Sequence, residues 1–130
     1  MGALSKTSLS VEERALLERF ASELRSRSQD DRAKIGRDVV WLFGSRARGE
    51  KPREDSDVDV LVLTEDESWE NKLRIHDALQ TAARALGLQA LTWSFSIHIN
   101  TPTWLEDRRR IHSFFVAEVD RDKIPLPVAK

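Results

Sequence analysis

The segment that most constrains the fold is the apolar run VDVLVL at residues 58–63. Alternate side chains of a strand point to opposite faces, and apart from Asp59 this run is apolar on both. A strand that must bury both faces lies in the interior of a sheet that is covered on both sides. The run therefore predicts a central strand over residues 57–64.

The rest of the chain alternates between helical and extended patterns. Ser10 and Glu13 form a capping box before an amphipathic helix. Thr103 and Glu106 form a second one, and Gly87 is a helix stop. We expect strands over residues 37–43 and 91–99, helices over 69–86 and 103–119, and loose tails at 1–9 and 121–130. This order predicts a single α/β (α+β) domain, residues 1–130, with helices packed on a small sheet.

Composition excludes several classes of protein. The chain has 130 residues, no cysteine and a net charge of −1. A disulfide framework and a cysteine-ligated zinc site are therefore excluded, and there is no strong sign of nucleic-acid binding. No apolar run approaches the roughly 18 residues of a membrane span, and no signal core is present, so we expect a cytoplasmic protein without membrane contact.

The acidic residues before the central strand have metal-ligand chemistry. Asp57 and Asp59 are two residues apart, so they project to the same face. Clustered carboxylates repel each other unless a cation joins them, and hard oxygen ligands favour Mg²⁺ or Mn²⁺. A calcium loop beginning at Asp55 is disfavoured, because its sixth position would need glycine and is Val60.

The turn before these carboxylates has anion-binding chemistry. Gly44 lets the backbone approach a ligand closely, and Ser45 offers a hydroxyl and an N–H group. Arg46 and Arg48 are cations suited to phosphate oxygens. An anion-seeking turn beside a metal-seeking carboxylate pair predicts a pocket for a nucleoside triphosphate with its metal.

The combined stretch, GSRARG followed by DSDVDVLV, resembles the signature of the minimal nucleotidyltransferases of the DNA polymerase β superfamily. The resemblance implies a small mixed sheet and transfer of a nucleoside monophosphate from a triphosphate, with ATP favoured, to a hydroxyl. It also implies that Gly44, Ser45, Arg46 and Arg48 bind the nucleotide while Asp57 and Asp59 hold Mg²⁺ or Mn²⁺. It suggests an antitoxin whose partner is a small helical HEPN-type toxin; a homodimer is a further expectation.

Two departures from the family pattern matter. The spacer at residues 46–56 is one residue longer than usual, which a loop absorbs at little cost. The family's third carboxylate falls at Ser96, which is a poor ligand and no base. His98, on the same face, is our candidate replacement base. A shifted alignment would instead bring in Glu106 or Asp107. The alternative function is a degenerate module that binds nucleotide and metal without catalysis.

Overall fold

The computed structural model describes residues 4, 6–30, 39–52 and 57–126 of the chain. The described elements are, in order, α1 (Val11–Asp30), β1 (Val39–Phe43), β2 (Val58–Leu63), α2 (Trp69–Leu86), the 3₁₀ helix η2 (Gln89–Ser94), β3 (Phe95–Asn100), α3 (Pro102–Arg110), α4 (Phe114–Asp122) and β4 (Ile124–Leu126). None of the described helices is both long and apolar enough to cross a lipid bilayer.

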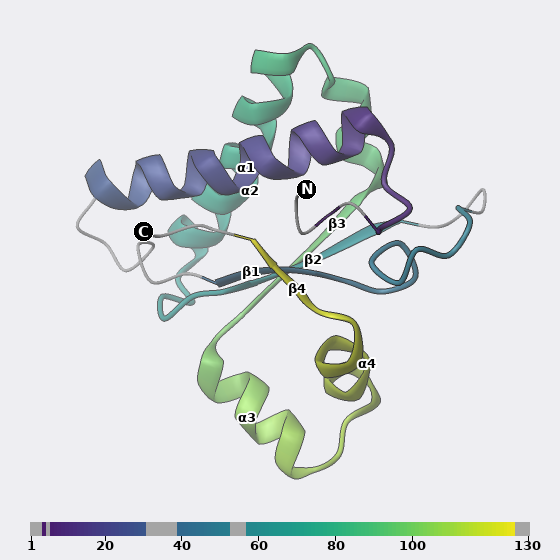
Figure 1. Cartoon of the computed structure of the whole chain (residues 1–130). Coiled ribbons are helices and arrows are strands. Elements are labelled where there is room, and N and C mark those ends of the chain that lie inside the picture. Colours follow the sequence, from purple (N-terminus) through teal and green to yellow (C-terminus); the bar gives the residue numbers. More distant parts are fainter. Residues whose placement is uncertain (1–3, 5, 31–38, 53–56, 127–130) are drawn as a thin grey trace.

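The described strands form one mixed sheet in the order β3-β2-β1-β4. β1 runs antiparallel to both β2 and β4, whereas β2 runs parallel to β3. Parallel neighbours need a crossover, and α2 supplies it (Figure 1). The small mixed sheet with helices packed on it, predicted from the sequence, is confirmed.

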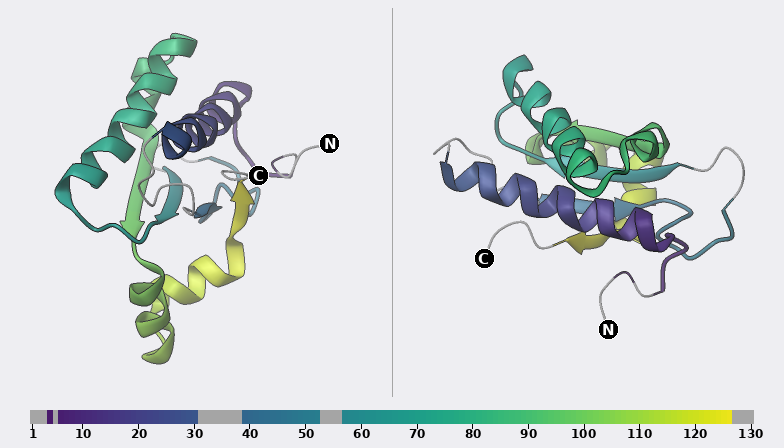
Figure 2. Two further views of the ribbon diagram at one scale, coloured as in Figure 1. Left: turned by 90° about the vertical axis from the view of Figure 1, so that its left-hand side faces the viewer. Right: turned by 90° about the horizontal axis from the view of Figure 1, so that it is seen from above.

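Helices cover both faces of this sheet, with α1 and α2 on one side and α3 and α4 on the other (Figures 1 and 2). Val58, Val60 and Val62 belong to the larger core, which α1 and α2 complete. Leu61 and Leu63 belong to a smaller cluster with side chains of α3 and α4. All five are buried, so the prediction of a strand covered on both faces is confirmed. Asp59, at an odd position of β2, therefore shares the face of α3 and α4.

The predicted start of the first helix and the predicted bounds of the second are confirmed. The N–H of Ser10 donates to Glu13 Oε1 at 2.8 Å, and the N–H of Glu13 donates to Ser10 Oγ at 3.0 Å. This reciprocal pair is the capping box that begins α1. At the start of α2 the hydroxyl of Ser68 accepts a hydrogen bond from the N–H of Asn71, and Gly87 ends that helix with φ of 70°.

Two of the strands have bounds in the structure that differ from those predicted from the sequence. The first is described from Val39, since residues 37 and 38 lie outside the described part of the chain. The third is shorter than residues 91–99, because η2 occupies Gln89–Ser94 and β3 begins only at Phe95. The hydroxyl of Thr92 donates to the carbonyl of Gln89 at 2.8 Å, a local bond that favours the turn over the strand.

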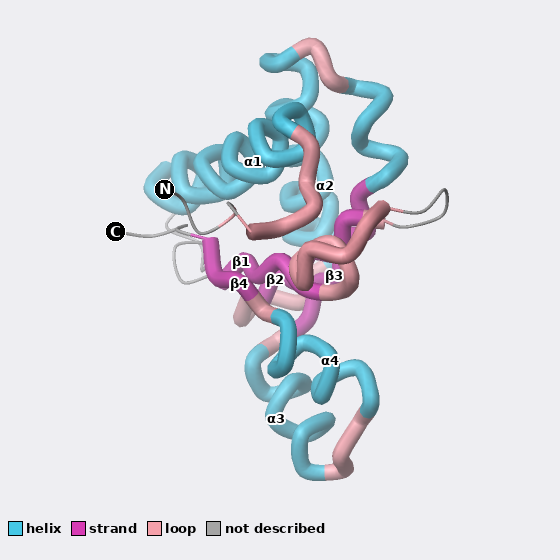
Figure 3. The backbone as a smooth tube through the Cα atoms, turned by 45° about the vertical axis from the view of Figure 1, so that its right-hand side comes forward, coloured by secondary structure: helices cyan, strands magenta, loops and turns pink. Residues whose placement is uncertain are grey.

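The single helix predicted over residues 103–119 is wrong, because the structure has two helices here (Figure 3). Thr101, not Thr103, caps α3, accepting a hydrogen bond from the N–H of Trp104 at 3.0 Å. The chain reverses around His112, whose φ is 56°. The reversal places Leu105 of α3 in one cluster with Val116 and Val119 of α4, which a continuous helix would separate.

The segments predicted as loose tails are packed wherever they are described. Leu4 and Leu9 are buried in the larger core, so residues 4 and 6–9 are not a free tail. At the other end, α4 continues to Asp122, and β4 pairs with β1 through Ile124 and Leu126. Pro125 suits this strand, because β4 lies at the edge of the sheet and an edge leaves some N–H positions unpaired.

Candidate functional site

The turn after β1 lies directly against a carboxylate of β2. Phe43, the last residue of β1, is paired in register with Asp59. Gly44 follows with φ of 84°, and a Cβ atom added there would lie 2.5 Å from Asp59 Oδ2. Only glycine combines this conformation with this close approach. The turn and the carboxylate are therefore parts of one site.

The predicted metal ligands stand at the start of β2. The side chain of Asp59 is 29% exposed, and Asp57, just ahead of the strand, is exposed. Within the described residues no group of three or more potential ligands gathers around one point. Two carboxylates beside this turn nevertheless fit Mg²⁺, which takes one or two carboxylates and completes its shell with water and substrate phosphates. Asp57 and Asp59 would hold such an ion.

The neighbouring strand places Ser96 and His98 beside Asp59. Ser96 is the register partner of Asp59 in the parallel β2–β3 pair, as the sequence alignment with the family predicted. His98 Nε2 lies 3.3 Å from Ser96 Oγ and 3.8 Å from Asp59 Oδ1. The position next to Asp59 is thus occupied by a hydroxyl and an imidazole in place of a third carboxylate.

Aromatic rings fix the position of the His98 imidazole. Its centroid lies 5.5 Å from the rings of both Phe43 and Phe115, and Phe115 meets Trp104 edge to face at 5.6 Å. These residues come from β1, α3 and α4, so the second face of the sheet holds the imidazole in place. His98 is positioned to act on a group bound next to Asp59.

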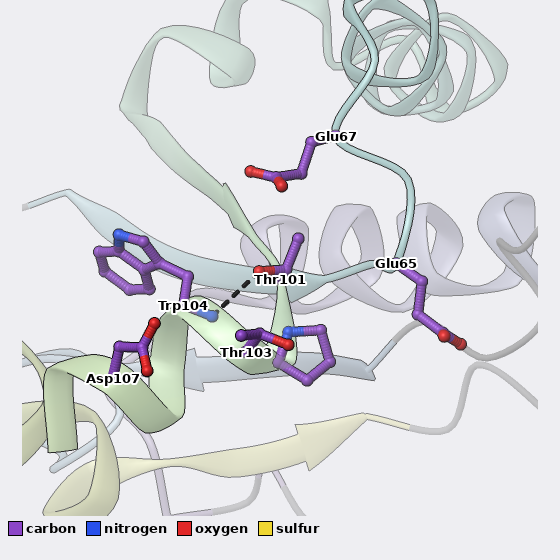
Figure 4. A pocket seen from close by; sticks show the side chains of 7 residues that line it. Glu65, Glu67, Thr101, Thr103, Trp104 and Asp107 are labelled. Atoms are coloured by element: carbon purple, nitrogen blue, oxygen red, sulfur yellow. Dashed lines mark hydrogen bonds between the residues drawn. The ribbon is translucent and has the colours of Figure 1, made fainter. Parts of the chain in front are cut away.

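The alternative acidic residues of α3 have other partners. Glu106 accepts a hydrogen bond from Arg109 at 2.6 Å, and Asp107 lies 3.6 Å from Arg110. Asp107 also lines a separate surface pocket of about 560 Å³ with Glu65 and Glu67 (Figure 4). This pocket lies where β2 and β3 end, whereas Asp59 lies where β2 begins. The shifted alignment therefore has no support from this arrangement.

The turn at residues 44–50 is compact rather than helical. The N–H of Arg48 donates to the carbonyl of Gly44, and the N–H of Glu50 donates to that of Ser45. Within the described part of the chain, no acceptor is seen for the N–H groups of Ser45 and Arg46. Ser45 is half-buried next to the glycine. Backbone donors in such a turn can receive an anion.

Arg46 has a structural environment that the sequence did not reveal. Its side chain is 5% exposed, and its guanidinium contacts the carboxylate of Glu13. It also donates to Ser8, through Nε to Oγ at 3.1 Å and through Nη2 to the carbonyl at 3.0 Å. These contacts disfavour the predicted phosphate contact of Arg46. The capping box identified Glu13 as a helix cap, but nothing in the sequence linked Glu13 to Arg46, which lies much later in the chain.

Arg48 joins the same turn to α4. Its Nη1 donates to Asp122 Oδ2 at 2.5 Å, and its Nε donates to Glu50 Oε2 at 2.8 Å. Burial opposes ionisation of Asp122, but hydrogen bonds from Arg121 and Arg48 outweigh it and lower the pKa of this carboxyl. The hydrogen bond to Glu50, against an opposing effect of burial, raises the pKa of Arg48. Sequence reasoning missed Asp122 because residues 121–130 were interpreted as a tail.

A hollow of about 420 Å³ opens beside His98, between β3 and the α3–α4 pair. It lies on the same face of the sheet as Asp59. Its lining residues are His98, Asn100, Trp104, Arg108, Ser113 and Phe115.

A mixed sheet with helices on both faces, a glycine turn against an Asp-x-Asp strand and a third strand beside it define a nucleotidyltransferase domain. A scan against family models agrees. It matches the family described as Polymerase beta, Nucleotidyltransferase over residues 33–99, more than half of the chain. The chain belongs to this family, and the resemblance to the polymerase β superfamily is confirmed. Searches of curated proteins and of solved structures gave no match.

Proposed function

We propose that this chain is a Mg²⁺- or Mn²⁺-dependent enzyme that transfers a nucleoside monophosphate from a nucleoside triphosphate, preferably ATP, to a hydroxyl. The observation that carries the proposal is the contact between Gly44 and the Asp59 carboxylate. It brings a turn in which the Ser45 and Arg46 N–H groups have no acceptor among the described residues to a carboxylate pair. Triphosphate oxygens and a metal need these two environments side by side.

Each residue has a role in the proposed reaction. Gly44 and Ser45 bind the triphosphate, and Asp57 and Asp59 hold the metal. A bound metal neutralises phosphate charge and lowers the pKa of the acceptor hydroxyl. The acceptor oxygen forms a bond to the α-phosphorus as the bond to the bridging oxygen breaks, and pyrophosphate leaves. His98 Nε2 receives the acceptor's proton.

We further propose that the acceptor is brought by a partner, such as a HEPN-type toxin for which this chain is the antitoxin. The α3–α4 connection exposes Ile111 and Phe114 to 65% and 94%, respectively. Exposed apolar side chains of this size are typical of protein contacts. Phe115 and Ser113, next to Phe114, line the hollow beside His98. A partner docked at this tip would therefore be near the site. A homodimer would use the same exposed side chains.

The second candidate function is a degenerate module that binds nucleotide and metal but transfers nothing. The observation that favours it is the register pairing of Ser96 with Asp59. Serine offers no negative charge to a second metal, so activation of the acceptor would depend on His98 alone. If His98 does not act as the base, transfer should be slower by about 10²–10⁴-fold, the typical cost of losing a positioned base.

The deciding experiment is incubation of the chain with α-labelled ATP, Mg²⁺ and the protein encoded beside it. Mass spectrometry should find one nucleoside monophosphate added to the neighbour, and Asp59→Asn should abolish the addition. Asp107→Asn is the matched control, since Asp107 lies in the other pocket, and it should retain transfer. Binding of ATP without any transfer would support the degenerate module instead.

A further inference from the structure

The hollow beside His98 lies on the side from which an acceptor must approach. In an in-line displacement the attacking oxygen stands opposite the leaving group. The triphosphate tail would lie at Gly44 and Ser45, next to β1, on one side of Asp59. The opposite side is β3, which neighbours β2 away from β1. His98 of β3 both contacts Asp59 and lines the hollow. His98 therefore borders both the hollow and the position next to Asp59.

The walls of the hollow combine aromatic surface with a few polar groups. Trp104 and Phe115 form an edge-to-face pair on one wall. Asn100 adds an amide, and Ser113 adds a hydroxyl that makes no capping bond to its own helix. An apolar wall with a small number of polar groups is the usual environment for a flat organic ring.

The charge of the hollow comes from Arg108. Its Cζ lies 5.2 Å from the centroid of the Trp104 ring. Among the described residues no carboxylate pairs with Arg108, whereas Arg109 pairs with Asp120 and Arg110 with Asp107. The lining contains no carboxylate either. A cation with no carboxylate partner among the described residues, at the edge of an aromatic hollow, favours a ligand that carries negative charge.

We propose that this hollow is the acceptor subsite, and that the acceptor group it takes is a hydroxyl on a flat ring with a negative charge nearby. The role of the bound group as acceptor rests on the proposed function, but the binding of such a group in the hollow does not depend on it. The ring packs on Trp104 and Phe115, the anion pairs with Arg108, and the hydroxyl lies at His98. The same charge disfavours polycationic acceptors.

The test compares ligands that share one ring. 4-Hydroxyphenylacetate, tyrosol and tyramine carry the same phenol with a negative, neutral and positive side chain. Each is titrated into the full chain, with and without Mg²⁺ and an ATP analogue whose α–β bridge is methylene. Uridine 5′-monophosphate tests whether a nucleotide can supply the flat ring and the negative charge. The readout is the indole N–H resonance of Trp104, assigned with Trp104→Phe and compared with those of Trp69 and Trp93.

We expect the anionic phenol to shift the Trp104 resonance and to bind about tenfold more tightly than tyramine. Arg108→Gln should remove this difference, and the control Arg110→Gln should keep it. Equal affinity for tyramine, an unchanged preference in Arg108→Gln, or shifts confined to Trp69 and Trp93 would each overturn the inference. Failure of the ATP analogue to bind, measured separately by calorimetry, would count against the proposed function alone.

Discussion

The backbone of Gly44 lies so close to Asp59 that a Cβ atom at residue 44 would stand 2.5 Å from Oδ2 of the carboxylate. Gly44→Ala should therefore displace this carboxylate as well as strain the backbone, since its φ is 84°. We expect a loss of about 1–3 kcal/mol in the free energy of unfolding, together with weakened binding of ATP and Mn²⁺. Urea denaturation and calorimetry measure the two effects.

Gly87→Ala is the matched control for this prediction. Gly87 also has a positive φ, 70°, but a Cβ there would meet nothing within 4 Å. Its substitution should cost only about 1 kcal/mol of stability and leave nucleotide binding unchanged. If both alanine variants bind ATP equally well, the contact between the turn and the carboxylate has no part in binding.

The carboxylates themselves should be required for metal-dependent binding. Asp57→Asn and Asp59→Asn remove one negative charge each with little change of shape, so a divalent ion loses a ligand. Calorimetry with ATP and Mn²⁺ should show binding that both variants weaken by at least about tenfold. Asp77→Asn, at an exposed position of α2, is a control that should bind like the parent. Parent-like affinity in both site variants would refute the metal assignment.

The sequence was informative where local pattern and chemistry coincide. The apolar run of β2 predicted its two covered faces. The resemblance to the family assigned Ser96 to the position of the third carboxylate, and the sheet pairs Ser96 with Asp59. Sequence reasoning failed where distant contacts decide. The helix break at His112 and the strand at Ile124–Leu126 depend on packing against β1 and β2, which no local pattern encodes.

The same limit applies to the arginines of the turn. Arg46 and Arg48 look alike in sequence, as cations next to a phosphate-binding glycine. In the fold they contact carboxylates of α1 and α4, Glu13 and Asp122. Only tertiary structure brings these partners together, so residue type alone suggested phosphate contacts for both.

The contact between Arg46 and Glu13 should be essential for stability. Arg46→Ala leaves a buried carboxylate without its partner, which typically costs about 3–5 kcal/mol. Arg110→Ala, which breaks an exposed pair with Asp107, should cost less than about 1 kcal/mol. Urea denaturation compares them. If Arg46→Ala unfolds at the parent's urea concentration but loses ATP affinity, Arg46 is a phosphate ligand after all.

Acid should loosen the contact between α3 and α4, whereas a change of pH near neutrality should leave this contact intact. A hydrogen bond from Arg109 lowers the pKa of Asp120, and the pKa of Asp122 is also lowered. A carboxyl with a depressed pKa in the folded state stabilises the protein above its unfolded pKa of about 4. That stability is lost as the pH falls from there through the lower folded pKa.

The measurement is the thermal midpoint from pH 7 to pH 3. The parent should lose stability below about pH 4, and Asp120→Asn should show a smaller loss from an already lower midpoint. Because the Arg109–Asp120 pair is partly exposed, its share should be no more than about 1 kcal/mol, even with two hydrogen bonds. An Asp120→Asn profile parallel to that of the parent would mean that Asp120 does not contribute.

Ser96→Asp should raise the rate of nucleotide transfer. The substitution places a carboxylate beside Asp59, on the face that the register assigns to it, and so supplies the missing ligand on the acceptor side. If His98 alone activates the acceptor in the parent, transfer there should be slow, and His98→Ala should lower it by about 10²–10⁴-fold. The rate of transfer by the parent, Ser96→Asp and His98→Ala is measured as release of labelled pyrophosphate in the presence of a candidate acceptor. Ile97→Asp is no substitute, because residue 97 packs against the core on the opposite face. Full activity in the parent that His98→Ala leaves intact would show that neither residue activates the acceptor.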